Sequence, residues 1–181
     1  MKPTILTYSG RYFDYSNPDP ESFTIIDLAM ALSRICRFGG HCQEFYSVAQ
    51  HSVLASYLVP KEKAFKTLMH DAHEALVGDM PSPMKLLCPD YKMLEKKIER
   101  VVLTKFGIDP EPDDDVKLAD MIMLKTEQRD LMLNTDEWSF APNIKPMPVK
   151  IVPASSDFAM LMFMKRFNEL CPIGAISETL E

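Results

Sequence analysis

Apolar residues recur at the spacing of an amphipathic helix along most of this chain, and glycine or proline separates one such segment from the next. The first segment starts after Thr24 and ends at Gly39-Gly40. The second starts at Ser47, a favourable N-cap residue, and stops before Pro60. Four more helices are expected over residues 61–78, 90–107, 116–133 and 155–170. The pattern predicts an all-α fold with little sheet.

The N-terminal residues and one proline-rich stretch depart from this pattern. Residues 4–15 carry β-branched and aromatic side chains on both sides of Ser9-Gly10, which predicts a small β-hairpin. Residues 81–89 hold too many prolines for a long helix, so a single turn or a loop is expected there. A chain of 181 residues suits one buried core. We predict a single domain over residues 1–181, a helical bundle with a small N-terminal β-hairpin.

Charge and composition exclude several classes of function. A formal net charge of -6 argues against binding a nucleic-acid polymer, which usually needs clustered Lys and Arg. The longest apolar run, residues 158–164, is far shorter than the roughly 18 residues of a membrane-spanning helix. The four cysteines form no CxxC pair, and the first residues lack the apolar core of a signal peptide. A cytoplasmic protein with reduced thiols and no membrane partner is expected.

Four polar side chains fall at inward positions of the expected helices. His51 lies on the apolar stripe of the second segment, His70-Asp71 lies within the third, and Asp120 interrupts an apolar face. Each has an ordinary explanation, since a core histidine is usually hydrogen-bonded and an aspartate in a helix can face water. Burying unpaired carboxylates costs several kcal/mol in practice, so two of them with two imidazoles favour a shared divalent cation.

The types of these side chains indicate which metal and which chemistry. Imidazole nitrogen and carboxylate oxygen suit Mn, Fe, Co, Ni or Zn better than Ca, and the absence of cysteine leaves positions open for water and substrate. A water on such a metal loses its proton near neutral pH. The set His51, His70, Asp71 and Asp120 therefore predicts a hydrolase.

Two more acids follow the His-Asp pair. Glu74 lies one helical turn after His70, where it can position or deprotonate a water or protonate a leaving oxygen. The alternative is an exposed glutamate that pairs with Lys66 or Lys85. Asp79 lies just beyond the expected helix, where it can contact a sugar hydroxyl or a departing phosphate oxygen, or serve only as a turn residue.

Phosphate recognition needs cations near these acids. Arg37 and Lys85 are favoured, because each flanks a segment already implicated and arginine suits bidentate contact with phosphate oxygens. Solvated surface charge is the alternative for both. No role is assigned to three further polar residues, which are His41, His73 and Arg129.

The order of His51, His70-Asp71 and Asp120 resembles that of the HD-domain metal-dependent phosphohydrolases. The segments SGRYFDY, LSRICRFGGH, FYSVAQHSV, LMHDAHEA, GDMPSPMK and ADMIMLKTEQRDL are similar to those of the short phage and prophage phosphohydrolases of the YfdR type. The resemblance covers roughly residues 7 to 170. It implies an HD-domain helical bundle in which these four residues hold one divalent metal, Mn, Co or Zn, and a homo-oligomer, either a dimer or a hexamer.

Two related groups imply roles for the remaining residues. In bacterial 5′-deoxynucleotidases of this superfamily, an arginine contacts phosphate, and two acids resembling Glu74 and Asp79 serve catalysis and deoxyribose recognition. Arg37 is its counterpart here, and Phe38 replaces a tryptophan that packs on the sugar, which leaves sugar recognition open. In the phage dATP triphosphohydrolases (DatZ-like), an arginine and a lysine placed like Arg37 and Lys85 hold the phosphates, and a further Mg or Mn can bind with them.

The favoured interpretation is a metal-dependent hydrolase of deoxynucleotides. Its favoured substrate is a purine dNTP, with dATP the leading candidate, from which it releases triphosphate. One alternative is a 5′-deoxynucleotidase that acts on dNMPs. The other is a non-catalytic HD module that senses a nucleotide, although the presence of both Glu74 and Asp79 beside intact metal-ligand positions argues against it.

Overall fold

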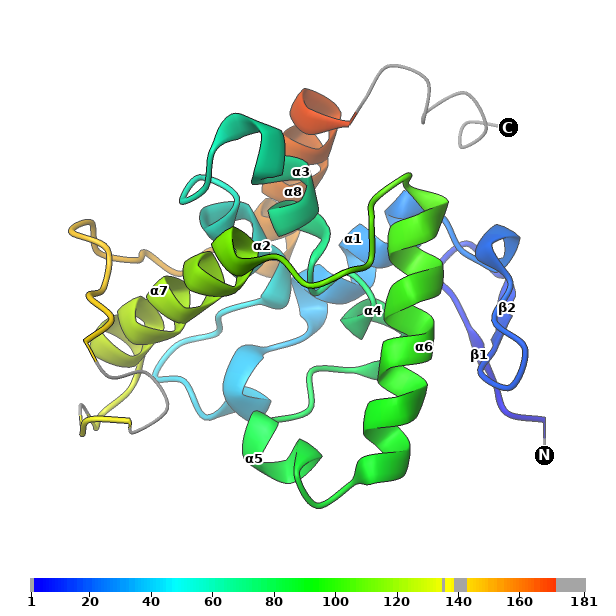
Figure 1. Cartoon of the computed structure of the whole chain (residues 1–181), viewed down its shortest axis with the longest axis horizontal. Coiled ribbons are helices and arrows are strands. Elements are labelled where there is room, and N and C mark those ends of the chain that lie inside the picture. The colour runs from blue at the N-terminus through cyan, green and yellow to red at the C-terminus, as the bar shows by residue number, and fades with distance from the viewer. Residues whose placement is uncertain (1, 135, 139–142, 172–181) are drawn as a thin grey trace.

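The computed structural model describes residues 2–134, 136–138 and 143–171, and these are mostly helical, as expected (Figure 1). Three helices pack against one another in the core: α1 (Ile25–Arg34), α2 (Val48–Ala55) and α8 (Ser156–Leu170). The remaining helices pack around them, and their bounds are α3 (Lys61–Met69), α4 (Glu74–Val77), α5 (Ser82–Lys85), α6 (Pro89–Lys105) and α7 (Asp114–Leu131). The all-α fold is confirmed.

The predicted N-terminal hairpin is confirmed. Strand β1 (Thr4–Leu6) pairs antiparallel with β2 (Tyr12–Asp14), and Ile5 lies opposite Phe13. Phe13 is fully buried and its ring packs edge-on against that of Phe23. The hairpin therefore closes one end of the helical core, as Figure 1 shows at the N-terminal side.

The core consists of apolar side chains that recur at helical spacing. Leu28 and Leu32 of α1 are fully buried, as are Ala159 and Phe163 of α8. The three methionines of α8 between residues 160 and 164 are half-buried and pack against the same cluster. Among the described residues, no helix is both long and apolar enough to span a membrane.

The prediction of one helix over residues 61–78 is wrong, because the structure has two helices separated by a turn in this range. Helix α3 ends at Met69, residues 70–73 form a turn, and α4 then begins at Glu74. The carbonyl of Thr67 accepts a hydrogen bond from the His70 ring at 2.7 Å as well as one from the His70 amide at 3.5 Å. Bonds between residues three apart continue through the turn, so the His70-Asp71 pair lies on a bend rather than within a helix.

The first helix also ends earlier than expected, at Arg34 rather than at the double glycine. The chain after it pairs with the residues that precede α2, since the amide of Arg37 donates to the carbonyl of Tyr46 at 2.9 Å. A short 3-10 turn, η2 (Arg37–Gly40), follows. Arg37 and Phe38 therefore belong to this turn, not to the first helix.

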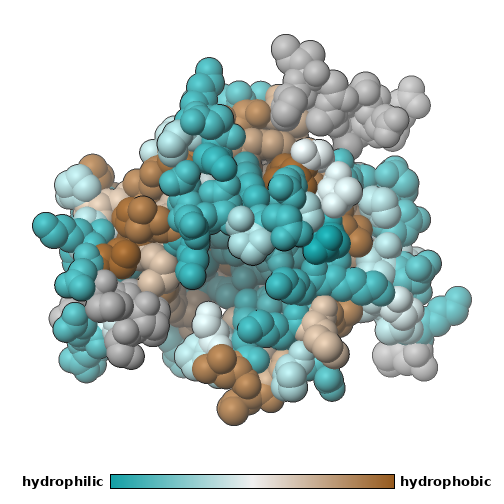
Figure 2. Space-filling view, viewed as in Figure 1, coloured by the Kyte–Doolittle hydropathy of each residue, from teal (hydrophilic) through white to brown (hydrophobic). Residues whose placement is uncertain are grey.

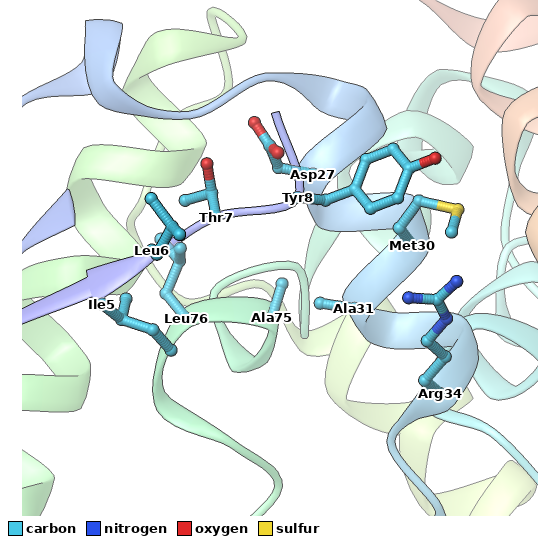
Figure 3. A pocket seen from close by; sticks show the side chains of 10 residues that line it. All are labelled: Ile5, Leu6, Thr7, Tyr8, Asp27, Met30, Ala31, Arg34, Ala75 and Leu76. Atoms are coloured by element: carbon cyan, nitrogen blue, oxygen red, sulfur yellow. The ribbon is translucent and has the colours of Figure 1, made fainter. Parts of the chain in front are cut away.

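A surface pocket of about 250 Å³ lies between the hairpin and helices α1 and α4 (Figure 3). Tyr8 and Arg34 border it, and the guanidinium carbon of Arg34 lies 5.8 Å from the centre of the Tyr8 ring. None of the residues predicted for the functional site lines this pocket.

Asp27 joins the hairpin to α1 and is predicted to matter for stability. Its carboxylate accepts hydrogen bonds from the amide and hydroxyl of Ser9 and from those of Thr24, at 2.6 to 2.9 Å. Asp27→Ala should lower the free energy of unfolding by about 2 kcal/mol, measured by urea denaturation. The exposed Asp157, in the first turn of α8, provides the control. An equal loss in Asp157→Ala would contradict the prediction.

Candidate metal centre

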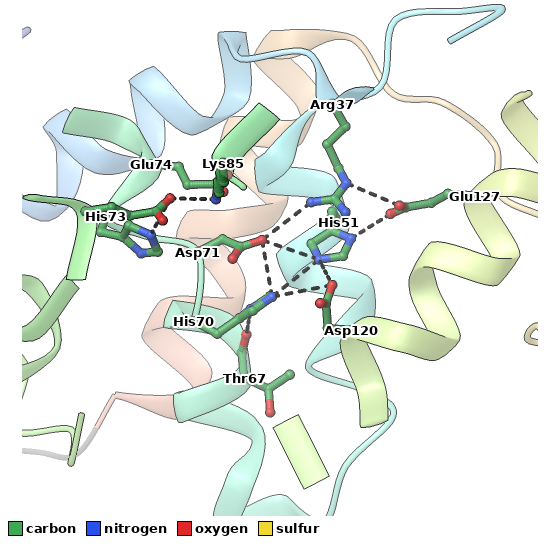
Figure 4. Close-up of polar contacts among 11 residues, drawn as sticks. Arg37, His51, Thr67, His70, Asp71, His73, Glu74, Lys85, Asp120 and Glu127 are labelled. Atoms are coloured by element: carbon green, nitrogen blue, oxygen red, sulfur yellow. Dashed lines mark hydrogen bonds and ion pairs between the residues drawn. The ribbon is translucent and has the colours of Figure 1, made fainter. Parts of the chain in front are cut away.

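Two imidazoles and a carboxylate from three separate segments converge at one point (Figure 4). The Nε2 atoms of His51 on α2 and His70 on the turn lie 3.4 Å apart. The Oδ1 atom of Asp120 on α7 lies 3.3 Å from the first nitrogen and 3.9 Å from the second. The structure therefore brings together three of the residues that were predicted to bind a metal.

The opposite nitrogen of each ring is already engaged. His51 Nδ1 lies 2.6 Å from Glu127 Oε1, and His70 Nδ1 lies 2.7 Å from the carbonyl oxygen of Thr67. Both partners accept hydrogen bonds, so each Nδ1 carries a proton, and in the neutral form of each ring Nε2 has a free lone pair. This is the usual way in which proteins orient histidines toward a metal.

The spacing of the two nitrogens also fits one metal ion. Nitrogens at about 2.1 Å from a common ion lie about 3.0 to 3.4 Å apart at octahedral or tetrahedral angles. The Nε2 atoms of His51 and His70 are 3.4 Å apart. Burial opposes a charge on His70, but the carboxylates of Asp71 and Asp120 outweigh it and raise the pKa of the ring well above its ordinary value, so a proton and a metal compete for Nε2.

Asp71, the fourth predicted ligand, lies beside this group. Its Oδ2 atom is 3.2 Å from His70 Nε2 and 3.6 Å from His51 Nε2. The same oxygen lies 3.4 Å from Arg37 Nη1. The His51 side chain is fully buried, whereas that of Asp120 is 39% exposed, so the cluster opens to solvent on the α7 side.

Glu127 is a residue of this site that the sequence reasoning missed. It is fully buried on α7, and its two carboxylate oxygens contact His51 Nδ1 at 2.6 Å and Arg37 Nε at 3.2 Å. Burial opposes the negative charge, but Arg37 and His51 outweigh it and hold the pKa of Glu127 below its ordinary value. Its position seven residues after Asp120, two turns along the same helix, was the available signal.

Glu74 is buried on α4, only 4% exposed, so the alternative of an exposed glutamate is wrong, although the pairing with Lys85 that it included is present. Lys66 instead donates to the carbonyl of Glu111, and Lys85 Nζ lies 3.8 Å from Glu74 Oε1. Burial raises the pKa of Glu74 well above its ordinary value, and the nearby carboxylate of Asp71 adds to the effect. Glu74 therefore keeps its proton to higher pH than a solvated glutamate does.

Lys85 takes part in a second polar group, which adjoins the first. Its Nζ atom lies 2.5 Å from Glu95 Oε1 on α6, and His73 Nε2 lies 3.7 Å from the same oxygen. His73, Glu74 and Glu95 also have the arrangement of a possible metal site. The ammonium of Lys85 already supplies positive charge to Glu95 there, and Glu95 was not identified from the sequence.

The remaining candidates are distributed around the cluster. Burial raises the pKa of Asp79 above its ordinary value, with Asp71 contributing. The guanidinium of Arg37 bridges Asp71 and Glu127 and is largely buried. Arg129 pairs with Asp130 and donates to two backbone carbonyls, and His41 is exposed.

The face of the molecule seen in Figure 2 is hollowed near its centre. Hydrophilic residues border the hollow, which lies between α7 and α6. These are the helices that carry Asp120 and Glu95.

Comparison with known proteins agrees with this geometry. YfdR of Escherichia coli strain K12, described as an uncharacterized protein, is 49% identical over 170 residues, which cover 92% of this chain and 94% of YfdR. A family model described as 5′-deoxynucleotidase YfbR-like matches residues 41–130. The chain belongs to the YfbR-like 5′-deoxynucleotidase family. An uncharacterized protein of Rhodobacter capsulatus is 32% identical over 110 residues, 55% of this chain and 56% of that protein.

Membership of the YfbR-like family makes the chain a metal-dependent phosphohydrolase of the HD-domain class, as predicted. The matched region contains all four predicted metal ligands and also Glu127, which the sequence reasoning missed. It begins after Arg37 and Phe38, so substrate contacts by these two residues stay predictions.

Glu127 is expected to control metal affinity without touching the metal. Glu127→Gln keeps an acceptor for His51 but removes the charge that holds Arg37, so binding of Mn²⁺ or Co²⁺ should weaken roughly 10- to 100-fold. Isothermal titration of the metal-depleted protein measures this. Glu62→Gln, at an exposed glutamate of α3, is the control, and equal affinities in the two variants would contradict the role.

The protonation of Glu74 predicts a pH-dependent effect on stability. An unfolded glutamate loses its proton near pH 4.3, whereas the folded one keeps it to higher pH, so folding is penalised increasingly as pH rises above about 5. Glu74→Gln removes this penalty. The melting temperature of the metal-depleted variant should exceed that of wild type more at pH 8 than at pH 5. A difference that does not change with pH would refute the assignment.

Proposed function

We propose that this enzyme hydrolyses 2′-deoxynucleoside 5′-monophosphates to deoxynucleosides and phosphate. One divalent metal, which is Mn, Co or Zn, is held in this proposal by His51, His70, Asp71 and Asp120. The observation that carries it is the convergence of two Nε2 atoms, both oriented by hydrogen bonds to their Nδ1 atoms, on the Asp120 carboxylate. The family description supports the substrate class.

The charges of the site suit a phosphorylated substrate only with a metal present. Arg37 and the two histidines hold the pKa values of Asp71, Asp120 and Glu127 below their ordinary values, so all three carboxylates favour the negative form that a bound metal would offset. When bound, the metal supplies Lewis-acid stabilisation of the charge that develops on phosphate oxygens and makes an attacking water more acidic. Arg37, held by Glu127, lies where its guanidinium adds to that stabilisation.

Glu74 and Asp79 are assigned the proton transfer and the sugar contact. Burial raises the pKa of Glu74 well above its ordinary value, which suits a general acid that protonates the departing 5′-oxygen. Asp79 follows α4 and is half-buried, which suits an acceptor for the deoxyribose hydroxyl. Phe38, next to Arg37, packs on the nucleoside.

A purine dNTP triphosphohydrolase, with dATP as substrate, is the second candidate. The observation that favours it is Lys85, whose ammonium lies beside the acid Glu74 and could meet a longer phosphate chain, with a further Mg or Mn bound to the phosphates. To do so it must leave Glu95, which holds it at 2.5 Å. The monophosphate is therefore placed first.

Substrate and product decide between these candidates. Purified protein with Mn²⁺ or Co²⁺ should release inorganic phosphate from dNMPs faster than it turns over dNTPs. Triphosphate released from dATP as the main product would select the second candidate. No turnover of any nucleotide with either metal would leave only the nucleotide-sensing module and would overturn the proposal.

Two variants separate metal binding from proton transfer. Asp71→Ala should lose bound metal and activity while keeping its helical circular dichroism. Glu74→Gln should keep metal but lose rate, roughly 100-fold or more, because general acid catalysis contributes about that much. Metal content by plasma mass spectrometry distinguishes them, and full activity of Asp71→Ala in metal-saturated buffer would contradict the ligand assignment.

A further inference from the structure

Two aromatic side chains from distant parts of the chain lie close together near Arg37, which contacts the predicted metal ligand Asp71. The ring centres of Phe38, in η2, and Trp138, after α7, lie 6.5 Å apart with 46° between the ring planes. Both side chains are only half-buried. The pair is therefore a partly open aromatic surface.

The backbone at Phe38 has a conformation that residues other than glycine rarely adopt. Its φ angle is 56°, in the left-handed region, and Gly39 follows at 61°. A non-glycine residue seldom adopts this conformation unless its surroundings enforce it, and such residues concentrate at ligand sites. The turn places the Phe38 ring against the preceding side chain, with the guanidinium carbon of Arg37 5.6 Å from the ring centre.

Arg37 connects this aromatic pair to the metal cluster. One end of its guanidinium lies 3.4 Å from Asp71 Oδ2. The carbon of the same guanidinium lies 5.6 Å from the centre of the Phe38 ring. A nucleotide with its phosphate at the cluster thus has aromatic surface within a short reach of its base.

Trp138 is fixed to the helix that also carries Asp120. Gln128 of α7 donates to the carbonyl of Asp136 at 2.7 Å, which ties down the segment before the tryptophan. Lys125 Nζ lies 5.9 Å from the centre of the indole ring and donates to Gln128 at 3.0 Å. The indole therefore has a defined position relative to the predicted metal ligands.

We propose that Phe38 and Trp138 form the nucleobase subsite of this enzyme, in which a base stacks on the aromatic pair and a purine binds more tightly than a pyrimidine. The proposal rests on the proposed function in taking a nucleotide as the ligand. Aromatic stacking accepts every base, and its strength grows with the area of the base. Base preference then comes from Trp138, outside the metal cluster.

The first experiment uses the fact that the chain contains a single tryptophan. Fluorescence of the Zn²⁺-loaded Glu74→Gln variant, which should keep metal but turn substrate over slowly, is titrated with dAMP, dCMP and 2-deoxyribose 5-phosphate. We expect quenching by dAMP at lower concentration than by dCMP, and none by the base-free sugar phosphate. No quenching by dAMP, or equal changes with dAMP and the sugar phosphate, would overturn the proposal.

The second experiment compares kinetic constants of holoenzyme variants on dAMP. Trp138→Ala should raise KM roughly tenfold, a loss typical of one stacked base, with kcat within about twofold, while Trp138→Phe should recover most of the loss. Tyr57→Ala is the matched control, because Tyr57 is an exposed aromatic that stacks with Arg166 at 3.8 Å. A fall in kcat with unchanged KM, or an equal rise in Tyr57→Ala, would refute the subsite.

The two experiments also separate this proposal from the proposed function. Quenching by dAMP without hydrolysis of any nucleotide would support the base subsite and reject the hydrolase. Hydrolysis of dAMP that Trp138→Ala leaves unchanged would support the hydrolase and reject the subsite.

Discussion

The arrangement of the site depends on one buried carboxylate. Glu127 has no exposure to solvent, and its two oxygens divide between the His51 ring and the Arg37 guanidinium. A buried charge is tolerated only when it is paired, and here each of its partners needs the same carboxylate to be oriented. His51 thereby points its Nε2 atom toward Asp120, and Arg37 points its Nη1 atom toward Asp71. Removing the carboxylate would release both.

A second consequence of burial concerns charge. The site gathers several buried carboxylates around one arginine, so each carboxylate has to be compensated by its own neighbours. Glu74 adjusts by keeping its proton. Glu95 adjusts by binding Lys85. Asp71 and Asp120 lie against the two histidines, which hold the pKa of each carboxylate below its ordinary value, and in the proposed function a divalent cation occupies the same place.

The sequence predicted the fold class and the hairpin, because those features depend on local periodicity and on residue type, and it singled out His51, His70 and Asp120, which the structure brings together. It failed where a side-chain hydrogen bond or the packing of other helices overrides the apolar pattern. The apolar spacing through His70 continues as if the helix did, but the Thr67 carbonyl accepts two bonds from His70 and the helix ends. Glu127 and Glu95 were missed for a related reason, since a charged residue in a helix is ordinarily solvated and only the packing of other helices shows otherwise.

The candidate ligands come from α2, the turn before α4, and α7, and the long helix α6 separates the last of these from the others along the chain. A cut in the connection between α6 and α7 would leave His51 and His70 on one fragment and Asp120 with Glu127 on the other. Neither fragment would carry a complete set of ligands. Metal binding would then require both fragments and would depend on their concentrations. Bound metal could therefore serve as a measure of how much of the two fragments has reassembled.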